Sequence, residues 1–303
     1  YLHMFRGLLY GSYQKPKELV WIFGCTIYLA MMAEGFLGYV LPYGQMSYWG
    51  AQVIISLFGA IPYIGESLEL WIRGDYYISG ITISRFFALH VVALPLVLIA
   101  LVFLHLVALH EVGAGNPEGV DIEAHLDDDG VPLDSVPFFP YKVLNALVGI
   151  GVFMTVFSVI MFFFPEGGGY FIEMANFQEA NPLVTPEHIA PVWYYAPFYT
   201  MLRAIPDPLG GLVVMGSAVA IFFVVPWLDR SNVASIRYKG LYSKIALTMF
   251  GVSFITLGYL GTVGVTEIRK TMSVICTIIY FAYFLLMPIY TKYETTKEVP
   301  QRL

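Results

Sequence analysis

The sequence predicts an all-α fold, a multi-span transmembrane helical bundle, and three observations favour this class. Of the 303 residues, 58% are hydrophobic and 13% are charged, whereas a soluble domain carries about 25% charged residues. The mean hydropathy is +0.69. The apolar residues also gather in runs of about 20, the length that crosses a bilayer. Such long runs without strict alternation form helices, because lipid offers no partner to backbone polar groups.

Six apolar runs have spanning length, and a shorter one precedes them. The six extend approximately over Leu19 to Val40, Phe86 to Ala108, Val143 to Phe164, Leu209 to Leu228, Ile245 to Val265 and Met272 to Tyr290. The chain begins without Met and without the pattern of a signal peptide. Only about ten apolar residues precede Gly11, so we expect the first segment to be the end of a helix that starts upstream.

The connections between these runs predict which parts share a membrane surface. Two long connections, Tyr39 to Ser84 and Pro165 to Pro208, should lie on one side, with the acidic stretch Glu118 to Asp134 and the C-terminus on the other. Of the 16 Lys and Arg residues, eleven fall on that second side and five on the first. The positive-inside rule therefore places the acidic loop and the C-terminus in the cytoplasm or the mitochondrial matrix. The net charge of -6 comes largely from this acidic loop, which excludes a nucleic-acid-binding face.

Three histidines lie inside the predicted spans, where an ionisable side chain is costly and marks function by default. Two of them, His90 and His105, are fifteen residues apart on one helix, which separates them by roughly 22 Å along the axis and about 60° around it. Two imidazoles on one face at two depths suit two haems stacked across the bilayer. For each histidine taken alone, the alternative is a hydrogen-bonded packing role.

Helix parity predicts how the histidines pair. His3 lies near the cytoplasmic end of the first segment, at the depth that the next histidine-bearing helix reaches at His105. We expect these two side chains to bind an inner haem, and His90 to bind an outer haem with a ligand about fourteen residues upstream of His3. The sequence has no Cys-x-x-Cys-His pattern, which predicts two b-type haems held without covalent bonds.

Two arginines stand next to these histidines. Arg6 is one turn from His3, and Arg85 shortly precedes His90. Both are candidates to pair with haem propionates at a membrane boundary. The alternative is that each side chain reaches the lipid headgroups.

These residues resemble the cytochrome b family in long motifs that keep the family's order. The motifs are LHMFRGLLYGSY, GYVLPYGQMSYWGA, SLFGAIPYIG, RFFALH, HLVALHE, NPLVTPEHIAPVWYYAPFYTMLRAIP and LGG. The resemblance covers nearly the whole chain and implies helices B to H of an eight-helix cytochrome b fold, with the first helix missing. It assigns His90 to a low-potential outer haem, and His3 and His105 to a high-potential inner haem.

The resemblance also implies three parts of the chain. Residues 1–112 form a haem-binding part with the end of helix B, helices C and D and outer surface helices. Residues 113–141 form the acidic cytoplasmic loop. Residues 142–303 contain helices E to H and an outer loop that belongs to the quinol site.

The resemblance implies a function as the catalytic subunit of a quinol:cytochrome c oxidoreductase. Such a subunit oxidises quinol at an outer site and passes electrons through two haems to quinone at an inner site, coupled to proton translocation. The implied partners are a Rieske iron–sulfur protein, a cytochrome c-type subunit, quinone, membrane lipid and a second copy in a homodimer of the complex. The implied location is the inner membrane of a bacterium.

The outer quinol site is expected in the segments Gly38 to Gly50 and Pro191 to Arg203, which match its walls in the family. Aromatic walls suit a flat quinone ring, although such residues also pack at membrane interfaces. At the inner site, His110 matches the histidine that contacts quinone. The expected outer-site residues are Tyr39, Gly50, Trp193, Tyr194 and Tyr199.

Two departures from the family bear on proton transfer. Where the commonest motif reads Pro-Glu-Trp-Tyr, this chain has Val192, so our hypothesis is that Glu187, His188 or Tyr39 relays the quinol proton. At the inner site, Asn145 replaces an aspartate that is often found there. An amide accepts and donates hydrogen bonds but delivers no proton at neutral pH, so proton uptake there would depend on His110, Lys142 or water.

Two other functions fit parts of the sequence. A photosynthetic b/f-type subunit is favoured by the fifteen-residue spacing of His90 and His105, since mitochondrial members have one residue fewer. The unbroken chain after the histidine helix opposes it, and a proteobacterial cytochrome b fits both observations. A membrane transporter would more often show inverted repeats, which this sequence lacks.

Overall fold

A computed structural model describes residues 1–169 and 171–303. The described residues are almost all helix or loop, with two isolated β-bridges and no strand. Six helical segments are long and apolar enough to cross a membrane: Glu18–Val40, Gly80–Val112, Phe138–Phe163, Pro208–Leu228, Leu241–Thr262 and Glu267–Leu285. The structure therefore confirms the predicted transmembrane bundle, with a shorter helix before the first span.

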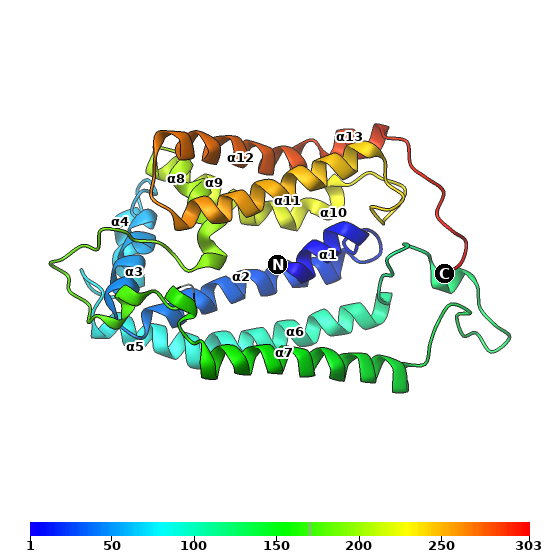
Figure 1. The fold of residues 1–303 in the computed structure, drawn as a ribbon, viewed down its shortest axis with the longest axis horizontal. Coiled ribbons are helices and arrows are strands. Elements are labelled where there is room, and N and C mark those ends of the chain that lie inside the picture. Colours follow the sequence, from blue (N-terminus) through cyan, green and yellow to red (C-terminus); the bar gives the residue numbers. More distant parts are fainter. Residues whose placement is uncertain (170) are drawn as a thin grey trace.

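The helices follow one another with short turns and two long loops (Figure 1). They are α1 (Leu2–Tyr10), α2 (Glu18–Val40), α3 (Gln45–Phe58), α4 (Gly65–Arg73), α5 (Gly80–Ala88), α6 (Leu94–Val112), α7 (Val143–Phe163), α8 (Ala196–Ala204), α9 (Pro208–Ala220), α10 (Val225–Leu228), α11 (Leu241–Thr262), α12 (Glu267–Leu285) and α13 (Met287–Tyr293). A π-helical turn, Leu89–Ala93, joins α5 to α6 in one continuous span. A 3-10 turn, Ile221–Val224, joins α9 to α10.

Several span boundaries differ by three to six residues from the sequence prediction, and two of these differences have a clear local cause. The second span begins at Gly80 and not at Phe86, because the backbone N–H of Ser79 donates to Thr82 Oγ1 at 3.1 Å and caps the helix there. The last span ends at Leu285, and α13 starts afresh at Met287 with Pro288 in its first turn. A proline has no backbone N–H to continue the preceding helix, so the helix is interrupted there.

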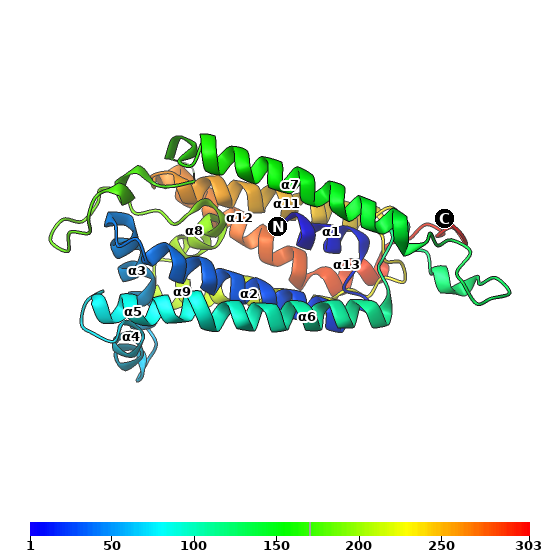
Figure 2. The same ribbon diagram turned by 90° about the horizontal axis from the view of Figure 1, so that it is seen from below.

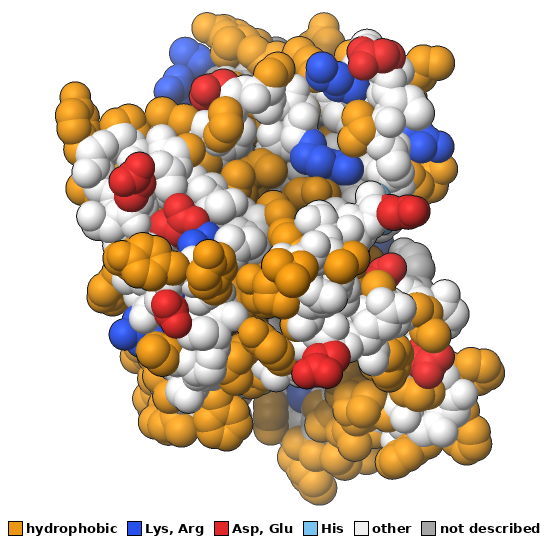
Figure 3. All heavy atoms as spheres, turned by 90° about the vertical axis from the view of Figure 1, so that its left-hand side faces the viewer, with side chains coloured by type: hydrophobic (Ala, Val, Ile, Leu, Met, Phe, Trp, Pro, Cys, Tyr) orange, Lys and Arg blue, Asp and Glu red, His pale blue; other side chains and the backbone are white. Residues whose placement is uncertain are grey.

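The two ends of the bundle match the predicted parity. Figure 1 shows α3, α4 and α8 at one end, and the C-terminus with the connection between α6 and α7 at the other. We call these the outer and the inner end. Figure 3 looks at the outer end, where hydrophobic side chains cover much of the surface between charged ones. Exposed residues such as Tyr63, Ile64 and Trp71 belong to this end, as expected of short helices that lie on a membrane surface.

The C-terminal half of the bundle has a closely packed aromatic core, to which Leu8, Tyr13, Trp21 and Cys25 from the N-terminal part of the chain also belong. Helix α8 buries seven residues between α9, α11 and α12. Phe250, Tyr280 and Phe284 are almost fully buried, and the rings of Phe250 and Tyr283 stack with centroids 4.6 Å apart. Aromatic packing of this kind supplies dispersion contacts, which hold helices together where lipid removes the hydrophobic driving force.

Helix α7 stands apart from this core. None of its residues is buried, and Figures 1 and 2 together place it along the edge of the bundle, away from α12 and α13 in the first view and away from α6 in the second. Its side chains are almost all apolar. The helix is therefore suited to contact lipid over most of its length.

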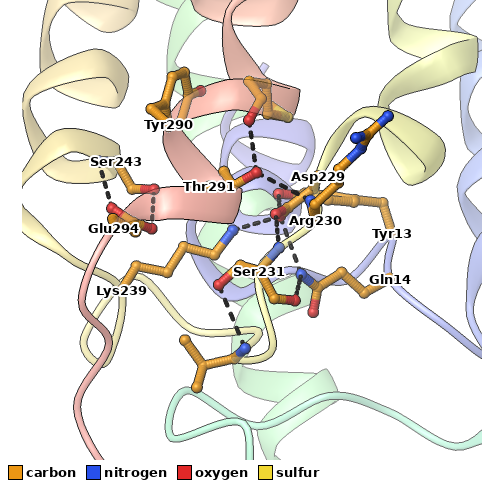
Figure 4. A network of polar contacts seen from close by, with 12 residues as sticks. Tyr13, Gln14, Asp229, Arg230, Ser231, Lys239, Ser243, Tyr290, Thr291 and Glu294 are labelled. Carbon is orange, nitrogen blue, oxygen red and sulfur yellow. Dashed lines mark hydrogen bonds and ion pairs between the residues drawn. The ribbon is translucent and has the colours of Figure 1, made fainter.

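A buried cluster of polar side chains connects two loops at the inner end of the bundle (Figure 4). Asp229 forms an ion pair with Lys239 and accepts hydrogen bonds from the Tyr13 hydroxyl at 2.6 Å and from Gln14 at 3.0 Å. Burial and the neighbouring Asp229 carboxylate raise the pKa of Tyr13. The cluster joins the loop after α1 to the loop between α10 and α11, and so fixes the inner end of α1.

Candidate cofactor and substrate sites

His3 and His105 face each other near the inner end of the bundle. They come from α1 and α6, and their ring centroids lie 6.5 Å apart with an angle of 72° between the planes. A metal–imidazole bond measures about 2 Å, so an ion between the two rings could bind one nitrogen of each. The Nδ1 atom of His105 is buried and has no hydrogen-bond partner among the described residues. This pair fits the predicted inner haem.

A cavity of about 750 Å³ surrounds this pair, which we call the inner cavity. Gly24 of α2 is one of its walls, and a Cβ atom there would lie 3.4 Å from Cε1 of His105. Arg6 and Lys17 also line the cavity. The described residues around it include two cations and no carboxylate, which suits a ligand that carries acidic groups.

His90 lies at the other level, near the outer end. Its Nδ1 atom is 3.0 Å from both the backbone oxygen and the Oε1 atom of Glu34. It lines a cavity of about 1520 Å³, the outer cavity, and is the one histidine among the described residues there. A Cβ atom at Gly38 would lie 2.4 Å from Cε1 of His90, so the close approach of α2 requires glycine at this position.

The π-helical turn sets the register between the two histidines. His90 and His105 are fifteen residues apart, yet they approach Gly38 and Gly24, which are fourteen apart on the antiparallel helix α2. A π-turn takes up one extra residue. The two histidines are therefore separated as if by fourteen residues, about 21 Å along the axis and about 40° around it. The predicted angle of about 60° assumed an uninterrupted α-helix and is corrected here.

A third cavity of about 500 Å³, the cleft, lies between α2, α3 and the segment that precedes α8. Three of the predicted quinol-site residues, Tyr39, Gly50 and Tyr199, line it together, and its lining is almost wholly apolar. Tyr39 and Tyr195 line both the cleft and the outer cavity. The cleft is therefore a neighbour of the His90 site.

A network of hydrogen bonds holds the outer loop against the start of α3. Gly44 and Glu179 form an isolated bridge. Gln45 donates to the Val184 carbonyl at 2.6 Å and accepts from the Asn181 amide at 2.7 Å. These contacts tether the chain before Ile189, which is where it begins to line the cleft.

Other predicted site residues lie elsewhere. Trp193 and Tyr194 line the outer cavity and not the cleft. Arg85 donates to the Trp71 carbonyl at 2.9 Å and is absent from the described residues around the outer cavity, whereas Arg6 does line the inner one. His110 is exposed at the end of α6.

The predicted proton-transfer residues also separate into two groups. Tyr39 lines the cleft, while Glu187 and His188 do not appear among the described residues of its wall. At the inner end, Asn145 and Lys142 are exposed at the start of α7, away from the inner cavity lining.

Sequence reasoning missed four residues that the geometry brings to these sites: Glu34, Gly24, Gly38 and Tyr195. Glu34 had a clear signal, since it is the only charged residue between Leu19 and Val40, and a charge inside a span marks function by default. The two glycines had none, because only their approach to His90 and His105 distinguishes them from other glycines.

Comparisons with known proteins identify the family of this chain. The family described as cytochrome b(N-terminal)/b6/petB matches residues 1–197, and the family described as cytochrome b(C-terminal)/b6/petD matches residues 179–281. Two curated relatives named cytochrome b are 54% identical in Allochromatium vinosum and 44% identical in Rhodospirillum rubrum. The matches cover 100% and 99% of this chain, and 75% and 71% of the relatives.

A solved structure gives the same result. A chain of a hyperthermophilic respiratory complex III superposes with a TM-score of 0.88 at 34% sequence identity, over 97% of this chain and 75% of that one. Both family descriptions match this single chain in order. Neither a photosynthetic b/f-type subunit nor a transporter is favoured by these findings.

Proposed function

The chain belongs to the cytochrome b family, and on that premise we propose that it is the catalytic, di-haem subunit of a quinol:cytochrome c oxidoreductase. The observation that carries this proposal is the arrangement of three sites across the bundle. An imidazole pair lies in the inner cavity, a third imidazole lines the outer cavity, and an apolar cleft adjoins the latter. Oxidation of quinol next to one haem, and transfer to a second, needs sites in this order.

The chain's own residues hold the cofactors. His3 and His105 are the proposed ligands of the inner haem, with Arg6 beside it for an acidic group, and His90 is the proposed ligand of the outer haem. When bound, the two haems supply one-electron transfer between the outer and the inner side. Gly24 and Gly38 keep α2 close enough to support both histidines without filling the cavities.

The cleft is the proposed site of quinol oxidation. Its apolar wall favours a ring and an isoprenoid-like tail over water, and a few polar groups suffice to orient such a ligand. The Tyr39 hydroxyl is the proposed proton relay among the three predicted candidates, because only Tyr39 lines the cleft. Tyr199, which donates a 3.2 Å hydrogen bond to the Ile189 carbonyl, supports the loop that closes the cleft.

The inner quinone site is proposed at the inner end, near His110 and the start of α7. The exposed imidazole of His110 and the exposed amide of Asn145 are both able to hydrogen-bond a quinone carbonyl. Lys142 is the proposed source of a proton for the reduced product.

The proposed partners follow from the same chemistry. A Rieske iron–sulfur protein takes one electron at the outer end, a cytochrome c-type subunit receives it, and the complex is a homodimer in the bacterial inner membrane. The acidic loop and the C-terminus are proposed to face the cytoplasm, because the cationic residues are concentrated at the inner end.

A substitution at Gly50 tests the quinol site directly. A Cβ atom at Gly50 would meet nothing within 4 Å, so Gly50→Leu should fill the cleft without displacing a neighbour. We expect quinol-dependent reduction of the b haems to fall at least about 100-fold, since excluding a ligand from its site removes the whole oriented complex. The reduced-minus-oxidised spectrum should be unchanged.

Gly80→Leu is the matched control, because Gly80 lies at the outer end and also has no neighbour within 4 Å of a Cβ. Normal quinol oxidation in the Gly50→Leu complex would contradict the proposed site. Loss of activity in both variants would also count against the proposed site, because it would show that any large side chain at the outer end abolishes activity.

A further inference from the structure

A single carboxylate stands beside the outer histidine, inside a membrane span and about two turns from its outer end. Glu34 belongs to α2, and its side chain is 17% exposed. Its Oε1 atom lies 3.0 Å from Nδ1 of His90, while its Oε2 atom is buried without a hydrogen-bond partner among the described residues. A carboxylate inside a membrane span costs free energy, so its presence requires an explanation.

The contact has a chemical meaning for a metal-ligating imidazole. A histidine that gives its Nδ1 proton to a hydrogen bond presents Nε2 to the metal, and a carboxylate partner makes that nitrogen a stronger electron donor. The Glu34 backbone oxygen, also at 3.0 Å, already suffices to fix the tautomer. The side chain therefore adds a carboxylate beside Nδ1 that orientation of the ring does not require.

The second histidine of the same helix provides an internal comparison. Nδ1 of His105 is buried and unpaired among the described residues. Arg6 and Lys17 line the inner cavity and no carboxylate does, whereas Glu34 is the one charged side chain among the described residues around the outer cavity. The two cavities are thus electrostatically opposite.

We propose that Glu34 is a redox-tuning residue: its carboxylate, held against His90 Nδ1, stabilises the oxidised form of the outer haem and keeps that haem at the lower potential. This inference rests on the proposed function, because it needs a haem bound at His90. A negative charge beside the ligand favours the more positive oxidation state, and second-sphere hydrogen bonding is one of the ways in which a protein sets a haem potential. The cationic side chains of the inner cavity raise the reduction potential of the inner haem. Electron transfer from the outer haem to the inner haem is therefore favourable.

The test is a redox titration of the assembled complex carrying Glu34→Gln, followed by the absorbance of each b haem. Glutamine keeps a hydrogen-bond acceptor of similar size and removes the charge. We expect the reduced-to-oxidised ratio of the outer haem at fixed ambient potential to rise about tenfold, which is about 59 mV for a one-electron couple. The inner haem should titrate as in the wild type.

Two further variants complete the design. Glu66→Gln makes the same chemical change at an exposed position of α4, and should leave both potentials unchanged. Glu34→Asp keeps a carboxylate, and should keep the outer potential closer to wild type than Gln does. If Gln displaces the outer haem but Asp retains it at low potential, the requirement for a carboxylate is upheld.

The proposal is overturned if Glu34→Gln leaves the outer potential within the spread of the wild type and Glu66→Gln. It is also overturned if Gln and Asp both displace the haem, because Glu34 would then act only in packing. Failure of the proposed function is a separate result, since in that case the wild-type complex itself would contain no b haem to titrate.

Discussion

The two halves of this bundle are built on different principles. In the C-terminal half, 33% of the residues in the most apolar stretch of α11 are buried, and 28% of those in α12. In the N-terminal half, the corresponding fractions are 11% in α2 and 6% in the span formed by α5 and α6. Phe250, Tyr280 and Phe284 are almost fully buried between the C-terminal helices, although Phe250 also lines an apolar space of about 820 Å³ against α1. The N-terminal half instead holds glycines and histidines around two large cavities.

This difference shows where each half obtains its order. Helices in lipid associate through close packing and hydrogen bonds, and the C-terminal half provides both from its own side chains. The N-terminal half leaves space at the two levels where His90 and His105 face α2, and a bound cofactor would supply the missing contacts. Substitutions in the N-terminal half should therefore affect cofactor binding. Substitutions in the C-terminal half should affect the stability of the fold.

Among the changes that test this comparison of the two halves, the largest effect is expected at Gly38. A Cβ atom there would lie 2.4 Å from Cε1 of His90, so Gly38→Ala should push the imidazole out of position and reduce occupancy of the outer haem at least about tenfold, as loss of ligand orientation does in metal sites. The haem content of the purified complex measures this. Gly149→Ala in α7, where a Cβ meets nothing within 4 Å, should retain both haems; an intact outer haem in Gly38→Ala would contradict the proposed geometry.

A one-residue change in the π-helical turn sharpens the same comparison. Deleting Val92 should convert Leu89–Ala93 to ordinary α-helix and keep both histidines in register, because the turn takes up one residue. Inserting alanine after Val92 should rotate one histidine by about 100° relative to the other. We expect the absorbance of both b haems in the deletion variant and of only one b haem in the insertion variant. Equal loss in the two variants would refute this role of the turn.

An intermediate effect is expected from Phe250→Ala in the C-terminal half. Its ring stacks on Tyr283 at 4.6 Å and contacts Tyr280 and Phe284. Phe→Ala in a soluble core costs about 3–5 kcal/mol, and we expect the lower end because lipid also solvates the separated helices. Thermal unfolding of the complex measures the loss, and the haem spectrum below the transition should be unchanged. Loss of a haem without loss of stability would contradict the assignment of stability to the C-terminal half and cofactor binding to the N-terminal half.

The smallest effect concerns pH at the inner end. Hydrogen bonds from Arg302 lower the pKa of Asp134. A carboxyl group whose pKa is lower in the folded state contributes stability above its unfolded pKa, and the contribution is lost as the pH falls through the lowered value. A spin label at Gln301→Cys should therefore become more mobile only as the pH falls below about 4, the ordinary pKa of an aspartate. In an Asp134→Asn background the label should be mobile throughout, and a mobility that still depends on pH there would exclude Asp134 as the cause.

Much of the fold followed from hydropathy alone. Span length, helix parity and the grouping of connections at the two ends depend on the bilayer thickness, so the sequence is sufficient to predict them. Capping at Ser79 and the break before Met287 moved two boundaries, because such local effects act over only a few residues.

The sites were less predictable than the fold. Spacing on one helix placed His90 and His105 at two depths, but spacing alone does not reveal the π-turn at Leu89–Ala93, which directly precedes the first turn of α6 with its Pro95. Trp193 and Tyr194 illustrate the same limit. They neighbour cleft residues in sequence, yet a 3-10 turn at Trp193–Tyr195 directs them to the outer cavity.

The most direct test of the account is the reduced-minus-oxidised spectrum and redox titration of the assembled complex carrying His105→Leu. His125→Leu, in the connection between α6 and α7, is the matched control. The account predicts two b-type components in the wild type and in the control, and loss of only the higher-potential component in His105→Leu. Two undiminished components in the His105→Leu complex would contradict the assignment of the imidazoles to two levels.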